Sequence, residues 1–120
     1  QSLPAEQREQ IMNLPHIREK IRFIENDIIE ILGHPIFIGR HSSNHIFIDS
    51  LEVSRKHCQI TKHMLGHWYI QDLQSSNGTW IERGTAIVRG MTGEFRLEKG
   101  DVIHLAAPAS PNRVSLRIIP

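Results

Sequence analysis

The sequence predicts an all-β fold, a sandwich or a barrel built around one core. Short runs rich in isoleucine, valine and aromatic residues recur along most of the chain, and turn residues separate them. Glycine supplies many of these breaks, as at Gly84, Gly93 and Gly100. A chain of 120 residues fits one domain and buries enough surface to fold without disulfides or metals.

In the N-terminal third, helix and strand patterns compete. Residues 1–15 are mostly polar and end at Pro15, which predicts a short helix or a loose arm before a sandwich over residues 16–120. Isoleucines in residues 16–32 recur at helical spacing and also alternate as in strands. Turn signals at Asn26-Asp27 and Gly33-His34-Pro35 favour two strands, Lys20–Ile24 and Ile28–Leu32.

The remaining chain alternates between short apolar runs and polar loops. Met64-Leu65-Gly66 is expected to connect one hairpin, and residues 106–111 to form a surface loop. The further strands we expect are Ile36–Ile38, Ile46–Ile48, His57–Thr61, Trp68–Ile70, Trp80–Ile81, Ala86–Val88, Glu94–Leu97, Val102–Leu105 and Val114–Ile119.

Composition narrows the function classes. The formal net charge is +1, which gives no global electrostatic reason to expect nucleic acid or an anionic membrane as partner. No apolar run approaches the ~20 residues of a membrane helix. The lone Cys58 cannot form an internal disulfide. We therefore expect an intracellular protein, nuclear or cytoplasmic, excised from a longer chain.

Three polar groups stand where strands give way to loops. They are Gly39-Arg40, Ser54-Arg55-Lys56-His57 and Ser75-Ser76-Asn77-Gly78-Thr79. Loops at one end of a sandwich bring together residues that are distant in sequence. A phosphate monoester carries nearly two negative charges and three acceptor oxygens, so these cations, hydroxyls and amides suit a phosphate.

The order of these groups resembles the forkhead-associated (FHA) domain family, β-sandwiches that recognise phosphothreonine. The matching residues are Gly39-Arg40, Ser54-x-x-His57 and Asn77-Gly78-Thr79, with Gly100-Asp101 similar to a late turn of that family. The resemblance covers about residues 20–119 and implies two twisted, mostly antiparallel sheets. It implies a phosphothreonine-containing protein as partner, no cofactor and no catalysis.

The resemblance also implies a role for individual residues. Arg40 and Ser54 would contact the phosphate, Arg55 would assist, Ser76 would bind nearby, and Asn77 would hold the peptide backbone. The family reads the threonine methyl in a small apolar depression, and the loops 49–53 and 74–76 would select the partner. Support of the binding loops, without contact to the ligand, would come from Gly39, His57 and Gly78.

Several alternatives compete with this interpretation. Where the family often has a second Asn-Gly, this chain has Glu82-Arg83-Gly84, and Glu82 could repel an acidic ligand. A hydrolase would combine Ser54 and His57 with Asp49 or Asp72, but no nucleophile-elbow pattern is present. Zinc would have to use the pairs His41/His45 and His63/His67, which straddle loops and lack cysteine partners. The strongest alternative is a phosphate-independent scaffold or dimerisation module.

Overall fold

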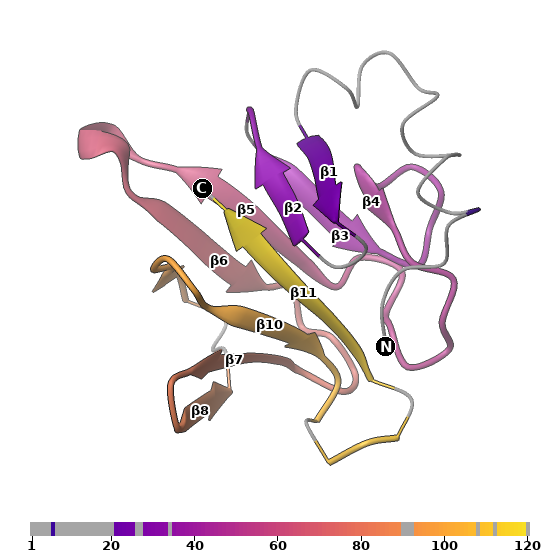
Figure 1. Ribbon diagram of the computed structural model, residues 1–120. Coiled ribbons are helices and arrows are strands. Elements are labelled where there is room, and N and C mark those ends of the chain that lie inside the picture. Colours follow the sequence, from indigo (N-terminus) through magenta and orange to yellow (C-terminus); the bar gives the residue numbers. More distant parts are fainter. Residues whose placement is uncertain are drawn as a thin grey trace.

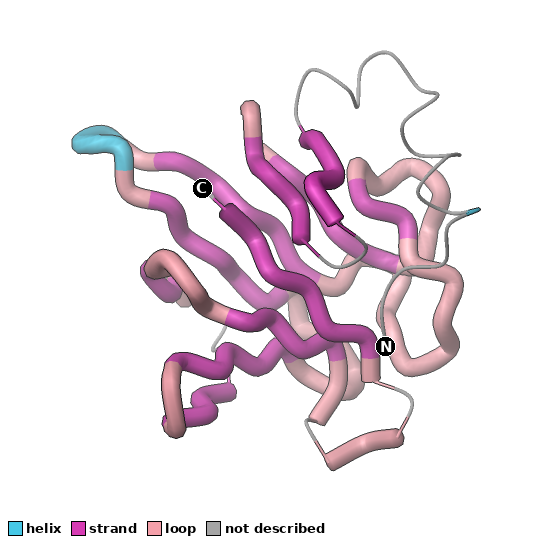
Figure 2. The backbone as a smooth tube through the Cα atoms, in the orientation of Figure 1, coloured by secondary structure: helices cyan, strands magenta, loops and turns pink. Residues whose placement is uncertain are grey.

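A computed structural model describes residues 6, 21–25, 28–33, 35–89, 93–107, 109–111 and 113–119. Apart from Glu6, the predicted N-terminal arm over residues 1–15 lies outside these residues, as do the turn residues Asn26, Asp27 and His34. The described chain consists almost wholly of strands and loops, with one short 3-10 turn, η1, at Met64–Gly66 (Figure 2). No helix among these residues is long and apolar enough to cross a membrane.

Among the described residues, eleven strands form two sheets (Figure 1). The strands are β1 Ile21–Glu25, β2 Ile28–Ile31, β3 Ile36–Gly39, β4 Ile46–Phe47, β5 Cys58–Lys62, β6 Trp68–Asp72, β7 Thr79–Arg83, β8 Ala86–Arg89, β9 Phe95–Arg96, β10 Val102–Leu105 and β11 Val114–Ile119. One sheet has the order β1-β2-β11-β10-β7-β8 and the other the order β4-β3-β5-β6-β9. The pairs β2/β11 and β3/β4 are parallel, and the other pairs are antiparallel.

The structure confirms the predicted all-β sandwich and decides the ambiguous N-terminal segment in favour of strands. Residues Ile21–Glu25 and Ile28–Ile31 pair antiparallel, with Ile21 opposite Ile31. Ile29 on β2 is fully buried. This burial fits the alternation of a strand rather than the apolar stripe of a helix.

Branched aliphatic side chains on the facing sides of the two sheets form the core. Alternate residues on most strands point inward, as with Ile36 and Ile38 on β3 or Ile60 on β5, which pairs with Ile70 on β6. The fully or almost fully buried members include Ile21, Ile29, Ile36, Ile38, Ile46, Ile48, Ile60, Ile70, Ile81, Ile103, Leu105 and Leu116.

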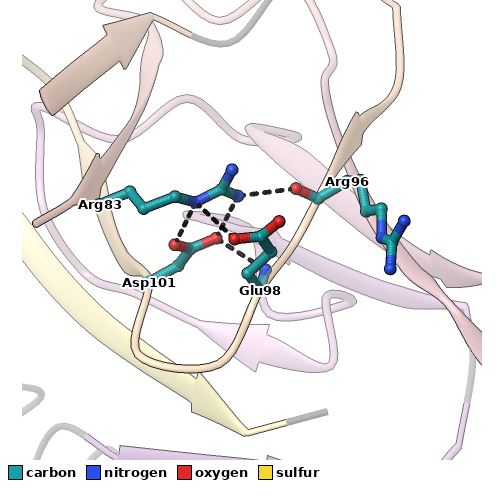
Figure 3. Close-up of polar contacts among 4 residues, drawn as sticks. All are labelled: Arg83, Arg96, Glu98 and Asp101. Carbon is teal, nitrogen blue, oxygen red and sulfur yellow. Dashed lines mark hydrogen bonds and ion pairs between the residues drawn. The ribbon is translucent and has the colours of Figure 1, made fainter.

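An ion pair ties the turn before β10 to the end of β7 (Figure 3). Gly100 there has a φ of +90°, a conformation that glycine adopts without steric cost. The buried Asp101 accepts two hydrogen bonds of 2.8 Å from Arg83, whose guanidinium also donates to the main-chain oxygen of Arg96 at 3.0 Å. The predicted glycine-aspartate turn is thus a structural joint at the far end of β7 from Thr79.

Candidate functional site

The three polar groups singled out in the sequence meet at one end of the sandwich. Arg40 directly follows β3, Ser54 lies in the loop between β4 and β5, and Ser76 and Asn77 lie in the loop between β6 and β7. The main-chain N–H of Arg40 donates to the main-chain oxygen of Ser54 at 2.9 Å. The N–H of Ser76 donates to Ser54 Oγ at 3.0 Å. Ser54 therefore links the other two groups.

The half-buried Arg40 has its guanidinium oriented by the fold. Its Nε donates to the main-chain oxygen of Val53 at 3.0 Å. No described residue accepts a hydrogen bond from its two terminal amino groups, which leaves them available to an anion. Arg55 and Lys56 are exposed on the next loop and add positive charge to the same end of the molecule.

Asn77 has a partner within the protein. Its amide nitrogen donates to the main-chain oxygen of Glu52 at 2.9 Å and lies 3.3 Å from the Glu52 carboxylate. Both Asn77 and Ser76 are exposed. A peptide laid over Asn77 would meet the acidic side chain of Glu52 as well as the amide, a contact that sequence reasoning missed because no motif marks Glu52.

Asn44 is a second residue that the sequence did not reveal. Its side chain is 4% exposed, and its amide nitrogen donates to the main-chain oxygens of His41 at 2.8 Å and Arg55 at 2.7 Å. It thereby joins the loop after β3 to the loop before β5. In the sequence it is an ordinary loop asparagine before a strand, which carries no specific signal.

Gly39 sits where two chain segments approach closely. A Cβ atom at this position would lie 2.1 Å from the main-chain oxygen of Arg55 and 2.8 Å from Asn44 Nδ2. Only a residue without a side chain fits this approach. The structure thus gives a steric reason for a glycine immediately before Arg40.

We expect Gly39→Ala to destabilise the fold by about 1 to 3 kcal/mol, because the added methyl group forces two loops apart. Chemical denaturation followed by tryptophan fluorescence measures this loss. Gly93→Ala is the matched control, since a Cβ there has nothing within 4 Å. Equal midpoints for Gly39→Ala and Gly93→Ala would show that the loops adjust without cost.

His57 is fully buried and connects two loops. Its Nδ1 accepts a hydrogen bond of 3.1 Å from the N–H of Ser54, so Nε2 carries the proton and donates to the main-chain oxygen of Gly78 at 2.8 Å. Burial lowers the pKa of His57, and this outweighs the bond to Gly78 and the nearby Asp72, which act in the opposite direction. The imidazole is therefore neutral at neutral pH.

Gly78 needs its freedom from a side chain. Its φ of +85° is in the left-handed region, and a Cβ would lie 2.8 Å from Arg89 Nε. The next residue, Thr79, is buried, and its hydroxyl donates to Asp72 at 2.7 Å. Asp72 also accepts from the N–H of Ser75 at 3.2 Å, which shapes the loop that presents Asn77.

The hydrolase alternative does not match this geometry. Both ring nitrogens of His57 bond main-chain groups rather than a serine hydroxyl or a carboxylate. Asp72 accepts hydrogen bonds from Ser75 and Thr79 instead of from His57. The hydrogen-bonded chain of nucleophile, base and orienting acid that a hydrolase requires is therefore not formed by Ser54, His57 and Asp72.

Three of the four histidines considered for zinc have side-chain contacts elsewhere. His41 bonds Ser43, and His45 accepts from the N–H of Phe37 at 3.0 Å. His63 Nε2 hydrogen-bonds the Glu94 carboxylate. Within the described ranges no group of three or more potential ligands gathers to hold a metal ion.

Glu82, which we expected could repel an acidic ligand, lies on β7 rather than in the loop that carries Asn77. Glu82 lies near the end of β7 away from the loops, and its carboxylate bonds His104 Nε2 at 3.0 Å on the outer face of the six-stranded sheet. His104 also bonds Ser115 at 2.7 Å. Glu82 is close to Asn77 in the sequence, but the five residues of β7 extend about 16 Å and carry the far end of the strand away from the loop.

Comparison with known proteins identifies the fold family. The family model described as FHA domain matches residues 36–106. The oxoglutarate dehydrogenase inhibitor of Corynebacterium glutamicum is 36% identical over 73 residues, which are 59% of this chain and 50% of the relative. The chain thus spans about half the length of the curated relatives it matches, and these are bacterial proteins, which gives the expected nuclear location no support.

Solved structures agree with this match. The solution structure of the FHA domain of an Arabidopsis thaliana hypothetical protein is 30% identical, with a TM-score of 0.56 over 73% of this chain and 70% of that one. A structure from an analysis of phosphothreonine-dependent FHA domain interactions is 25% identical, with a TM-score of 0.57 over 84% of this chain and 94% of that one. The family model covers more than half of the sequence, and the chain belongs to the FHA domain family.

Proposed function

We propose that this domain binds phosphothreonine-containing segments of partner proteins at the loops that present Arg40, Ser54 and Asn77. The observation that carries the proposal is the guanidinium of Arg40, which is oriented by Val53 and has two terminal amino groups without an acceptor among the described residues. Ser54 and the cationic Arg55 lie beside it. Oriented, charge-assisted donors at one place are what a phosphate monoester requires.

Membership of the FHA family and the similarity to a domain analysed for phosphothreonine-dependent interactions support this function. The name of the bacterial relatives, an inhibitor of an enzyme, supports a regulatory rather than a catalytic role. We propose that Ser76 and Asn77 contact the peptide near the phosphate. Support of the loops comes from Gly39, His57 and Gly78.

We expect two loops to choose among peptides. The loop 49–53 contributes the Glu52 carboxylate beside Asn77. The loop 74–76 begins at Gln74, which with Gln71, Asp72 and Leu73 lines a shallow pocket at the end of β6. Glu52 gives the peptide site an acidic side opposite the cations Arg40 and Arg55, which favours peptides whose charges complement both.

Fluorescence anisotropy with degenerate peptide pools tests the function. We expect the pool containing phosphothreonine to bind, the unphosphorylated pool not to bind, and the phosphoserine pool to bind more weakly. The phosphate supplies most of the attraction through charge-assisted hydrogen bonds. Equal binding of phosphorylated and unphosphorylated pools by a folded domain would contradict the proposal.

The second candidate is a phosphate-independent scaffold. The contact that favours it is the bond from Asn77 to Glu52, since the amide expected to hold a peptide already has a partner in the unliganded domain. The same anisotropy experiment separates the two functions. A scaffold would bind its partner protein whether or not the partner is phosphorylated.

A further inference from the structure

The sheets have four edge strands, which differ in how they are protected against pairing with another chain. These are β1 and β8 in one sheet and β4 and β9 in the other. The register of β1 shifts between Phe23 and Glu25, a bulge of the kind that disrupts pairing. β4 and β9 have two residues each, too few for an extended ladder.

β8 has none of these protections. It pairs with β7 in unbroken register from Trp80/Arg89 to Arg83/Ala86, and its sequence, Ala-Ile-Val-Arg, contains no proline and one charge at its end. All four side chains are exposed, with Ile87 49% and Val88 45% exposed. Such an edge is a ready template for an added strand.

The hairpin geometry shows which groups face outward. Gly84 and Thr85 form the turn between Arg83 and Ala86. A tight turn of this length makes the closing pair a hydrogen-bonded one, so the next pair, Glu82 and Ile87, is not. The main-chain N–H and C=O of Ile87 therefore point away from β7, toward the edge where no described strand pairs with β8.

β8 is continuous with the candidate phosphopeptide site. The Arg89 guanidinium lies over the Trp80 ring, 5.4 Å from its centroid. The Trp80 indole N–H donates to the main-chain oxygen of Asn77 at 3.2 Å. The end of β8 thus lies beside the turn that carries Asn77, and Figure 1 shows β8 at the margin of the molecule beyond β7.

We propose that β8 binds, by strand addition, an extended segment of the same partner chain that carries the phosphothreonine. A second copy of this chain is the other possible occupant, but stable dimers bury about 800 Å² per partner. Four residues span only about 13 Å. A segment already tethered through its phosphate needs little additional attraction, since tethering makes the second contact intramolecular.

This inference rests on the proposed function, and its test is designed to separate the two. Phosphopeptides are selected on the wild-type chain from a pool with about eight degenerate residues on both sides of phosphothreonine, enough to reach along β8. Each is compared with a short version that retains only the residues next to the phosphothreonine. Ile87→Pro removes the outward-facing N–H, and Ile87→Lys keeps that N–H but places a charge on the edge.

We expect the long peptides to bind wild type about tenfold more tightly than their short versions, because only the long peptides also contact β8. Both Ile87 variants should lose this advantage and bind the short versions as wild type does. Ile24→Lys is the matched control, because Ile24 is 47% exposed on the opposite edge strand and should keep the advantage. If Ile87→Pro lowers the unfolding midpoint, the loss of the long-peptide advantage is judged on Ile87→Lys alone.

Equal affinity of long and short peptides, with short-peptide binding intact, would overturn the role of β8 and leave the phosphothreonine site standing. Failure of both the long and the short phosphopeptides to bind would overturn the site and the docking strand together. Sedimentation velocity of the unliganded chain provides the remaining outcome. A dimer that disappears in Ile87→Pro would assign β8 to a second copy instead.

Discussion

Arg40→Ala should remove most of the phosphate-dependent affinity, weakening phosphothreonine-peptide binding by about tenfold to a hundredfold. A hydrogen bond to a charged group contributes about 1.5 to 3 kcal/mol, and each 1.4 kcal/mol is a factor of about ten. The structure leaves both terminal amino groups of Arg40 without acceptors among the described residues, so they are the donors that an alanine deletes. Anisotropy titration of a selected phosphopeptide measures the loss.

Two variants control the Arg40 experiment. Arg40→Lys keeps the charge but loses the planar fork and the Nε bond to Val53, so we expect intermediate affinity. Arg117→Ala removes an exposed arginine next to the buried Leu116 on β11, away from the loops, and should bind like wild type. Wild-type affinity in Arg40→Ala would place the phosphate elsewhere.

His57→Ala should lower both stability and peptide affinity. The change leaves the N–H of Ser54 and the oxygen of Gly78 without their buried partner and opens a cavity where the imidazole was. These losses together cost about 2 to 4 kcal/mol. Denaturant unfolding measures the stability, and equal midpoints for wild type and His57→Ala would contradict the bracing role. His67→Ala, which removes a half-buried histidine beyond η1, is the control.

Acid titration of the same variants gives an independent measurement. The pKa of His57 is lowered by burial, so the unfolded chain binds this proton first as the pH falls. The stabilisation from neutral His57 is complete above its ordinary value of 6.5 and declines as the pH falls below it. We expect this part of the acid destabilisation to be absent in His57→Ala and unchanged in His67→Ala.

Local pattern was sufficient to predict the strands and the end of the sandwich that carries the site. Alternation places Ile60 and Ile70 on the inner face, and the structure buries both opposite each other. The segments around Arg40, Ser54 and Asn77 were expected to meet because each follows or precedes a strand, and hydrogen bonds now join them. Such patterns are readable because strand period and turn chemistry act over a few neighbouring residues.

The sequence by itself therefore determined an all-β chain, its family and a set of phosphate-binding candidates. The tertiary structure alone decided that Asn44 joins two loops and that the Asn77 amide donates a hydrogen bond to Glu52. It also decided that Glu82 bonds His104 and that β8 is an edge strand of the described sheet next to the site. These features depend on which strands become neighbours and how closely loops approach. Sheet order and loop packing join positions far apart in the chain, and local periodicity carries no record of them.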